Sequence, residues 1–186
     1  MEIKLNEEEK QNLLSIARNT IYDNLFSKKI QLLDNFYPKL DQVNGVFVTL
    51  TIDGQLRGCI GNIVGQYPLY LGTSKMAMQA AFHDPRFDPL TKEEYEKIKI
   101  EISVLSPITE IHHNEVVVGK HGLLIKHLYN SGVLLPQVPV EQGWSKKEFL
   151  EGVCVKAGLA KDAYLNKDCK LYGFTALVFN EGENNG

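Results

Sequence analysis

A cysteine and an arginine stand two residues apart in the segment 56–61 (LRGCIG), and this pair is the first candidate for chemistry. If the segment is a strand, Arg57 and Cys59 project from the same face. A guanidinium beside a thiol stabilises the thiolate, which is the nucleophilic form of cysteine. Gly58 and Gly61 leave space beside the thiol for a ligand or another backbone. The alternative is a buried cysteine that acts as a small apolar side chain among tightly packed glycines.

The segment 83–88 (HDPRFD) gathers an imidazole, two carboxylates and a guanidinium on a loop stiffened by proline. A catalytic interpretation makes His83 a base that Asp84 orients. A binding interpretation assigns Asp84 and Arg86 to a ligand. The structural alternative is that Asp84 and Arg86 cap the preceding helix and hold the loop by hydrogen bonds.

Two further candidate groups occur later in the chain. His121 lies between glycines and could act as a base or contact an anion, or it could be a turn histidine bonded to the backbone. Glu141 follows two prolines and could serve as a general acid or base. Trp144 would then form a pocket wall. Alternatively, Trp144 packs as a hydrophobic staple before a helix that begins at Ser145.

The elements that must position these groups can be read from caps, turns and periodicity. A helix should follow Asn6, because an acid stands three residues after this capping residue. Asp53 and Gly54 predict a tight hairpin turn between strands 45–52 and 55–60. Further along we expect a helix over 68–82, a strand over 98–105, a second hairpin over 123–135 that turns at 130–132, a helix from Ser145 to Gly158, and a last strand over 171–179.

This order predicts an α+β fold with antiparallel sheets and segregated helices. We expect a single domain over 1–186, with an extra N-terminal helix and a hairpin–helix–strand unit that occurs twice, in halves 45–110 and 118–180. The polar tail from Asn180 onward should be frayed.

Composition excludes several classes of function. The 186-residue chain carries a net charge of -3 and no basic stripe, so we expect no nucleic-acid binding. Three cysteines without a Cys-x-x-Cys pair fit a reducing cytoplasm. No apolar stretch approaches the ~20 residues of a membrane span. Phosphate-binding glycine loops are absent and His112–His113 lacks a carboxylate at ligand spacing, so we expect no cofactor and no metal.

Several motifs together resemble those of the AMMECR family. They are spread in consistent order over about residues 10–180: 57–61 (RGCIG), 84–87 (DPRF), 101–105 (EISVL), 119–123 (GKHGL), 134–138 (LLPQV), 141–144 (EQGW) and 156–159 (KAGL). The resemblance implies an α+β fold of two unequal, closely packed parts with a cleft between them. It also implies an association with Memo-like and radical-SAM proteins, beside which bacterial and archaeal relatives are often encoded. It implies no particular reaction.

Two functions are compatible with these residues. The first is an enzyme in which Arg57 activates Cys59, with His121 or Glu141 as proton carrier, for hydrolysis or group transfer in the modification of RNA, protein or a metabolite. The second is a non-catalytic module that binds a small molecule or partner protein through the same residues, where Arg57, Arg86 and His121 contact anions.

Overall fold

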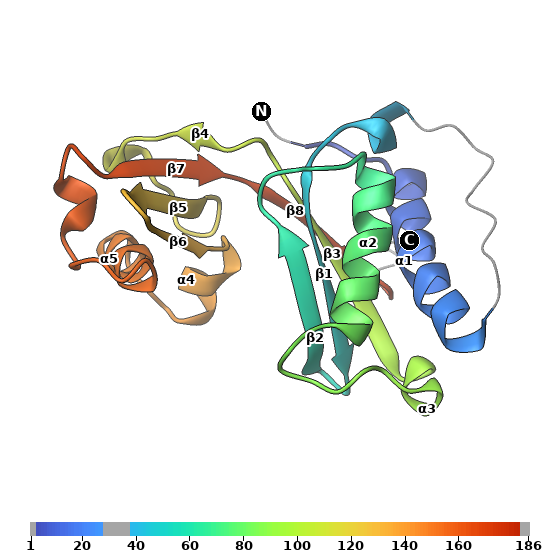
Figure 1. Cartoon of the computed structure of the whole chain (residues 1–186). Coiled ribbons are helices and arrows are strands. Elements are labelled where there is room, and N and C mark those ends of the chain that lie inside the picture. Colours follow the sequence, from blue (N-terminus) through green and yellow to red (C-terminus); the bar gives the residue numbers. More distant parts are fainter. Residues whose placement is uncertain (1–2, 28–37, 183–186) are drawn as a thin grey trace. The chain divides into compact units, whose positions relative to one another are not determined.

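The computed structural model describes residues 3–27 and 38–182, and these residues form two compact units (Figure 1). The first unit comprises Lys4–Leu105 together with the segment from Leu177 onward, and the second comprises Ser106–Ala176. None of the helices in the described ranges combines the length and the apolar character that a membrane span requires.

The first unit is a four-stranded sheet with its two long helices on one face (Figure 1). Its helices are α1 (Glu7–Phe26), α2 (Leu69–Phe82) and α3 (Lys92–Tyr95), with a 3-10 helix at Pro38–Asp41. Its sheet has the order β2-β1-β3-β8, formed by β1 (Gly45–Ile52), β2 (Gln55–Asn62), β3 (Ile98–Leu105) and β8 (Ala176–Asn180).

Local signals explain where these elements begin and turn. Asn6 caps α1, and its side chain forms a capping box with Glu9. Asp53 and Gly54 turn the β1–β2 hairpin with φ of 51° and 77°, as the predicted turn requires. Alternate residues of β1 and β3, including Val48, Leu50 and Ile100, are fully buried beneath the helices.

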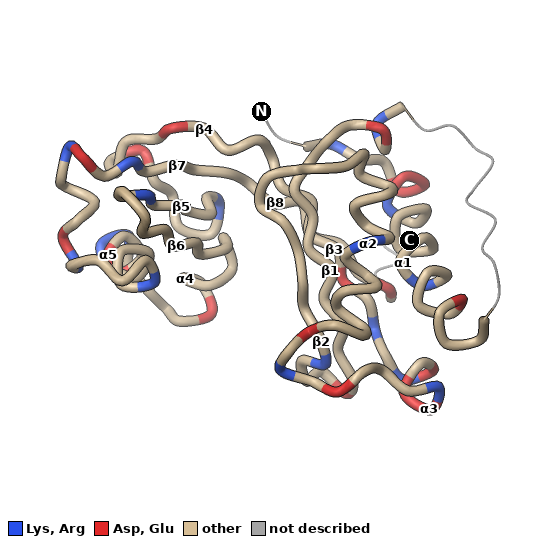
Figure 2. Tube along the Cα trace, in the orientation of Figure 1, with Lys and Arg blue, Asp and Glu red and all other residues tan. Residues whose placement is uncertain are grey.

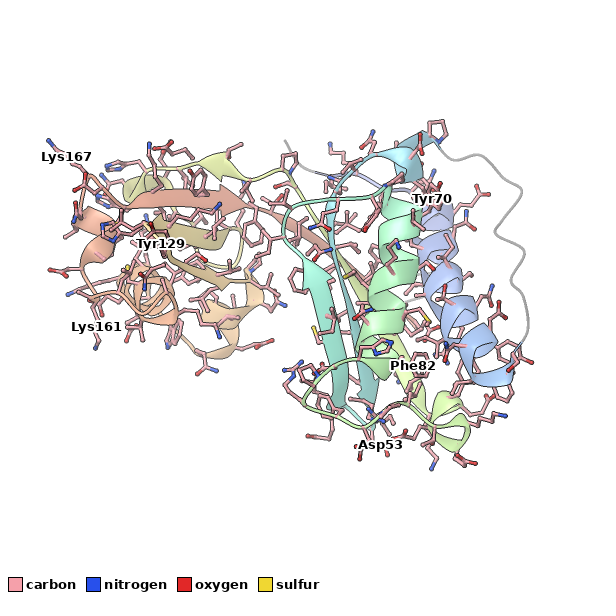
Figure 3. All side chains as sticks on the ribbon, in the orientation of Figure 1. Asp53, Tyr70, Phe82, Tyr129, Lys161 and Lys167 are labelled. Carbon is pink, nitrogen blue, oxygen red and sulfur yellow. The ribbon has the colours of Figure 1, made fainter. Side chains whose placement is uncertain are left out.

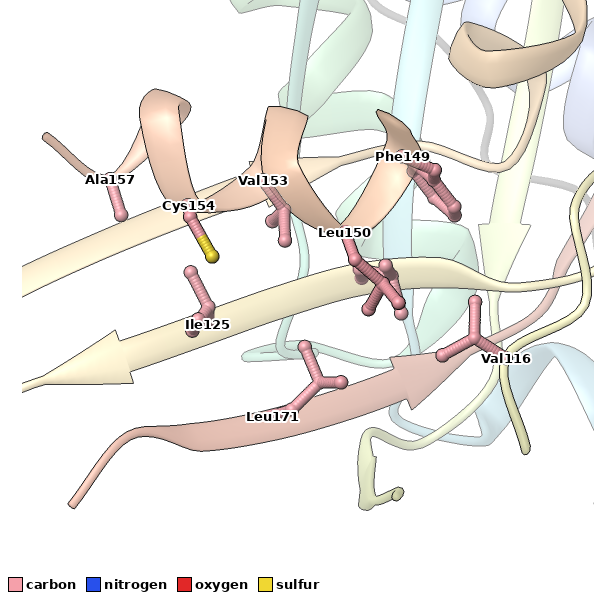
Figure 4. Close-up of a cluster of buried hydrophobic side chains, with 9 residues drawn as sticks. Val116, Ile125, Phe149, Leu150, Val153, Cys154, Ala157 and Leu171 are labelled. Atoms are coloured by element: carbon pink, nitrogen blue, oxygen red, sulfur yellow. The ribbon is translucent and has the colours of Figure 1, made fainter. Parts of the chain in front are cut away.

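The second unit is another four-stranded sheet, with the order β4-β7-β5-β6. Its strands are β4 (Thr109–Glu110), β5 (Gly122–His127), β6 (Asn130–Leu134) and β7 (Lys170–Phe174). Its helices are α4 (Gln137–Glu141) and α5 (Lys146–Lys156), with 3-10 helices at His113–Glu115 and Ala163–Leu165. One face of α5 packs on the sheet through a cluster of buried side chains that includes Phe149, Val153 and Ile125 (Figure 4).

Both sheets contain the same connection. In each, the first strand of a hairpin lies between the second strand and the strand that follows the helix, giving β2-β1-β3 and β6-β5-β7. The fourth strands are exchanged: β4 follows β3 in the chain but pairs with β7, and β8 follows β7 but lies beside β3. The α+β class with antiparallel sheets and segregated helices is therefore confirmed, whereas the internal halves 45–110 and 118–180 stay a prediction.

Three details of the predicted elements were wrong. The second hairpin turns at Leu128 and Tyr129, not at 130–132, because Asn130 already pairs with His127. The last strand is divided at Thr175, whose backbone exchanges hydrogen bonds with Ser106. The predicted fraying was wrong for the start of the tail, since Asn180 belongs to β8 and Arg18 binds the Glu181 carboxylate, while residues 183–186 of that tail lie outside the described residues.

Candidate functional site around Cys59

Cys59 lies in β2, the edge strand of the first sheet. Asp84 and Arg86, on the loop that follows α2, occupy the outer edge of this strand. The Cys59 backbone N–H donates to Asp84 Oδ2 at 2.9 Å, and Arg86 Nη2 donates to the Cys59 carbonyl oxygen at 3.3 Å. The pair thus fills the two hydrogen-bonding positions that a further strand would occupy. The backbone that carries the thiol is therefore held by this pair on its outer edge and by β1 on its inner edge.

The pair is itself a two-pronged ion pair. Arg86 Nε and Nη2 donate to the two Asp84 carboxylate oxygens at 3.0 and 2.8 Å, and the Arg86 backbone N–H adds a third bond at 3.1 Å. The Asp84 side chain is only 2% exposed, whereas that of Arg86 is 55% exposed. The hydrogen bonds from Arg86 outweigh burial and hold the pKa of Asp84 well below its usual range. The carboxylate is thus ionised at physiological pH.

Arg57 takes part in a second ion pair, with Glu94 of α3. Its Nε and Nη2 donate to the two Glu94 carboxylate oxygens at 2.8 and 2.9 Å, and Nη2 also donates to the Asp88 carbonyl at 3.0 Å. Chiefly because of the Arg57 hydrogen bonds, the pKa of Glu94 falls to about 2. The guanidinium groups of Arg57 and Arg86 both lie within 6 Å of the Phe87 ring centroid. Charges of both signs follow one another along the loop between α2 and α3 (Figure 2).

A β-bulge separates Arg57 from Cys59. Gly58 pairs with Leu50, but the next pair is Leu56 with Thr51, so Arg57 is an extra residue in β2. Strict alternation, which predicted that Arg57 and Cys59 share one face, does not hold across a bulge. The contacts favour a positioning role for Arg57, while its predicted activation of Cys59 stays a prediction.

The glycines beside the thiol are explained by packing. A Cβ at Gly58 would lie 2.1 Å from the Ala80 carbonyl oxygen in α2. A Cβ at Gly61 would lie 2.2 Å from the Phe47 ring on the neighbouring strand. Both positions therefore need glycine whether or not a ligand binds there.

The thiol has a neighbour that its own segment does not reveal. Thr49 of β1 lies directly opposite Cys59, and its hydroxyl donates to Cys59 Sγ at 3.2 Å. Thr49 is also directly opposite Glu101 of β3. Cys59, Thr49 and Glu101 therefore form one row across three strands, on the face opposite the buried residues of β1.

This row borders a cavity of about 330 Å³ on the same sheet. Thr49 and Glu101 line it together with Thr51, Lys99 and residues 180–182 at the end of β8. The carboxylate of Glu181 is already bound by Arg18, so its charge is balanced. Thr49 connects the cavity to the thiol, because one side chain contacts both.

His83 is the C-terminal cap residue of α2 in the first unit, and the remaining predicted residues belong to the second unit. His121 Nδ1 accepts the Val117 backbone N–H at 3.1 Å, and burial, together with Lys120, lowers the pKa of the imidazole. Glu141 is exposed at the end of α4. Trp144 packs against the cluster that contains Phe149, which is the staple arrangement expected before a helix cap.

The structure thus brings together part of the predicted site. Cys59, Asp84 and Arg86 are in direct contact, and Arg57 lies on the same strand in the first unit. A shared site with His121, Glu141 or Trp144, and a cleft between the two parts, stay predictions. Among the described residues, no three His, Cys, Asp or Glu side chains are grouped so that they could hold a metal ion.

Sequence reasoning did not identify Thr49 and Glu94 as candidates, and it left Glu101 open between a cleft carboxylate and a solvated one. Counting outward from the Asp53–Gly54 turn would place Thr49 opposite Gly58, and only the bulge at Arg57 brings it opposite Cys59. For Glu94, the available signal was its capping box with Thr91, which indicated a helix start and no partner in β2.

Comparison with known proteins gives a consistent result. A family model described as AMMECR1 matches residues 14–179. Protein NEQ441 of Nanoarchaeum equitans is 42% identical over 178 residues, covering 91% of this chain and 99% of that protein. A protein of Aquifex aeolicus is 41% identical over 181 residues, with 93% of each chain covered. The crystal structure of uncharacterized protein PH0010 from Pyrococcus horikoshii superposes with a TM-score of 0.87 at 40% identity, covering 97% of this chain and 95% of that one.

Proposed function

The chain belongs to the AMMECR1 family, and from that premise we propose that it is an enzyme in which Cys59 acts as a nucleophile in hydrolysis or group transfer. The substrate class is a small amide or thioester that enters the cavity beside β1 and β3. The observation that carries this proposal is the hydrogen bond from Thr49 to the Cys59 sulfur, at the border of that cavity.

The row of three side chains supplies a path for the proton. The thiol proton passes to the Thr49 hydroxyl oxygen while the hydroxyl's own proton passes to the Glu101 carboxylate, which lies opposite Thr49 on β3. The hydroxyl then donates its new proton to the thiolate sulfur, which is the hydrogen bond seen between Thr49 and Cys59. The sulfur then attacks the substrate carbonyl carbon, so that a C–S bond forms while the bond to the amine or thiol leaving group breaks. The proton held at Glu101 passes to the leaving group.

The second half of the reaction restores the cysteine. Water, or the nucleophile of an acceptor, attacks the thioester carbon, and the C–S bond breaks with its electron pair returning to sulfur. The proton released by the attacking group passes through Glu101 and Thr49 back to Cys59. The reaction requires no oxidant or reductant.

The two ion pairs serve as positioning groups in this proposal. Asp84 and Arg86 fix the backbone of Cys59, so the sulfur keeps its distance to Thr49 without a large entropic cost. Arg57 and Glu94 fix the loop that carries Asp84 and Arg86. His121 and Glu141 are not required for proton transfer in this scheme.

The rate of alkylation of each cysteine tests the proposal. Iodoacetamide at pH 6 to 7, followed by peptide mass spectrometry, measures Cys59 against Cys169, which is also partly exposed. We expect Cys59 to react faster than Cys169, and Thr49→Val to slow it on the order of tenfold because a hydrogen bond to the thiolate is lost. Thr51→Val is the matched control, since Thr51 lines the same cavity but lies opposite Leu56 and not Cys59. If Cys59 were alkylated no faster than a free thiol of ordinary reactivity, the proposal that Cys59 is a nucleophile would be overturned.

A non-catalytic binding module is the second candidate, and one observation favours it. Gly58 and Gly61 are explained by packing, and the Arg57 and Arg86 guanidinium groups are both bound to carboxylates, so the segment 56–61 needs no reaction to account for it. In this case the polar face would hold a small molecule or a partner protein, with Memo-like and radical-SAM proteins as candidates. Cys59→Ser would then leave the cellular function intact, whereas the enzyme requires the sulfur.

A further inference from the structure

A smaller cavity in the second unit is lined by hydrogen-bond donors and is not used by the proposed reaction. Its volume is about 170 Å³, and its polar side chains are those of Ser106, Thr109, Lys120, His121 and Thr175. Within the described residues, this lining contains one lysine, one histidine and three hydroxyl groups, and no carboxylate. Such a lining favours an anion over a cation or an apolar molecule.

We propose that this cavity binds a phosphate group, either as inorganic phosphate or as the phosphoryl end of a small metabolite. The volume equals roughly five or six times the ~30 Å³ that a water molecule occupies in the liquid, which leaves room for one tetrahedral oxyanion and a few waters. Phosphate offers several acceptor oxygens. The donors that the lining offers come from Lys120, His121 and the hydroxyl groups of Thr109 and Thr175, because the Ser106 hydroxyl already donates to the Pro107 carbonyl.

A backbone hydrogen bond fixes His121, which lines this cavity, in the form that has its donor on Nε2. Its Nδ1 accepts the Val117 backbone N–H at 3.1 Å, so the proton of the neutral imidazole lies on Nε2. Burial and the neighbouring Lys120 lower the pKa of His121, while Glu115 opposes this effect, so the ring is largely neutral at pH 7. A bound phosphate dianion would stabilise the imidazolium and raise the pKa of His121.

The backbone around the cavity is held in place before any ligand binds. Ser106 Oγ accepts the Thr175 backbone N–H at 2.9 Å and donates to the Pro107 carbonyl at 3.2 Å. Gly119 has a φ of 81°, a conformation that favours glycine and sets the turn that leads into Lys120 and His121. The donors are therefore carried on a preorganised backbone, which limits the entropy lost on binding.

The test follows the His121 ring by NMR in the full-length protein during titration with sodium phosphate at pH 7. His121→Gln assigns the resonance. We expect a saturable shift with a dissociation constant in the millimolar range and a rise in the His121 pKa, neither of which sodium chloride at equal ionic strength reproduces. Glycerol phosphate and acetate are parallel arms: tighter binding of glycerol phosphate than of inorganic phosphate indicates a metabolite, and equal binding of acetate would overturn the choice of phosphate.

Matched variants separate a site from general attraction. Lys120→Gln should weaken phosphate binding about tenfold, whereas Lys126→Gln removes a lysine that lies outside the cavity lining and should change it less than twofold. The Thr109→Val and Thr175→Val changes, combined, should weaken binding without changing net charge. Equal effects of Lys120→Gln and Lys126→Gln, or a shift that does not saturate, would show only nonspecific attraction and overturn the proposal.

Discussion

The two units use the same hairpin–helix–strand order but are stabilised differently at their edges. In both, a glycine in the second strand of the hairpin lies against the helix: Gly58 against Ala80 of α2, and Gly132 against Val153 of α5 and the helix's C-cap residue Ala157. In the first unit, ion pairs made by Asp84 and Glu94 then secure the edge strand β2. In the second, the buried cluster beneath α5 provides the main packing (Figure 4).

This difference shows where chemistry can be placed. An edge strand fixed by side-chain ion pairs keeps its thiol on a polar face, next to a cavity. In the second unit, Cys154 lies on a helix, α5, and not on an edge strand. Its side chain belongs to the apolar cluster, where burial raises the pKa of the thiol. Similar element order therefore yields one reactive candidate and one inert cysteine.

The largest effect should come from adding a methyl group at the close contacts that the units share. Gly58→Ala puts a Cβ 2.1 Å from the Ala80 carbonyl oxygen, and Gly132→Ala puts one 2.5 Å from the Ala157 nitrogen, so a helix must move in each case. We expect each variant to lower the free energy of unfolding by about 3 kcal/mol or more in urea titrations. Gln55→Ala and Ser131→Ala, at exposed neighbouring positions, should change it little.

The same pair of variants should differ in its effect on the thiol. Gly58→Ala displaces the strand beside Cys59 and should alter its alkylation rate, whereas Gly132→Ala should leave that rate unchanged in the folded protein. A Gly58→Ala protein as stable as the parent would contradict the close approach of β2 and α2.

Acid should weaken the two units in different pH ranges. The folded-state pKa values of Asp84 and Glu94 are depressed, so their contribution is complete above their unfolded values of 3.8 and 4.5 and is lost as the pH falls toward about 2. The pKa of His121 is also depressed below 6.5, so the unfolded state binds its proton first and stability starts to fall just below pH 6.5. Glu148 adds a lowered pKa in the second unit, but it is fully exposed.

Urea unfolding from pH 7 to 2 can resolve these two ranges. We expect His121→Gln to flatten the pH dependence of the unfolding free energy just below pH 6.5 and nowhere else. Glu94→Gln should lower the unfolding free energy by on the order of 2 kcal/mol at pH 7, and this difference from the parent should vanish near pH 2. A difference between Glu94→Gln and the parent that is constant with pH would contradict the ion-pair explanation.

The smallest effect concerns the two hairpin turns. The first residue of each turn has a φ of 51°, but Asp53 is polar and Leu128 is apolar. Asp53 suits this conformation, whereas Leu128 is strained there and 86% exposed. Asp53 and Tyr129 mark the ends of the two hairpins in Figure 3. We expect Leu128→Asn to stabilise the protein by about 0.5–1 kcal/mol and Asp53→Leu to destabilise it by a similar amount. The same sign for both in urea titrations would show that the turns do not differ in strain.

The sequence by itself determined the elements whose signals are local. Asn6, Thr91 and Ser145 begin helices because their side chains cap the first turn, and Asp53–Gly54 turns a hairpin because both residues tolerate positive φ. The α+β class and the family followed from such signals and from motifs in consistent order. The second turn was misplaced because a strained Leu128 carries no turn signal.

Only the tertiary structure decided which side chains meet. The bulge at Arg57 moves Cys59 opposite Thr49, and a bulge has no fixed sequence signal when its residue is an arginine. The partners of Arg57 and Asp84 lie 37 and 25 residues away in the chain, at Glu94 and Cys59 respectively. Such pairings depend on loop path and strand register, which long-range packing sets, so the sequence identified the thiol but not its neighbours.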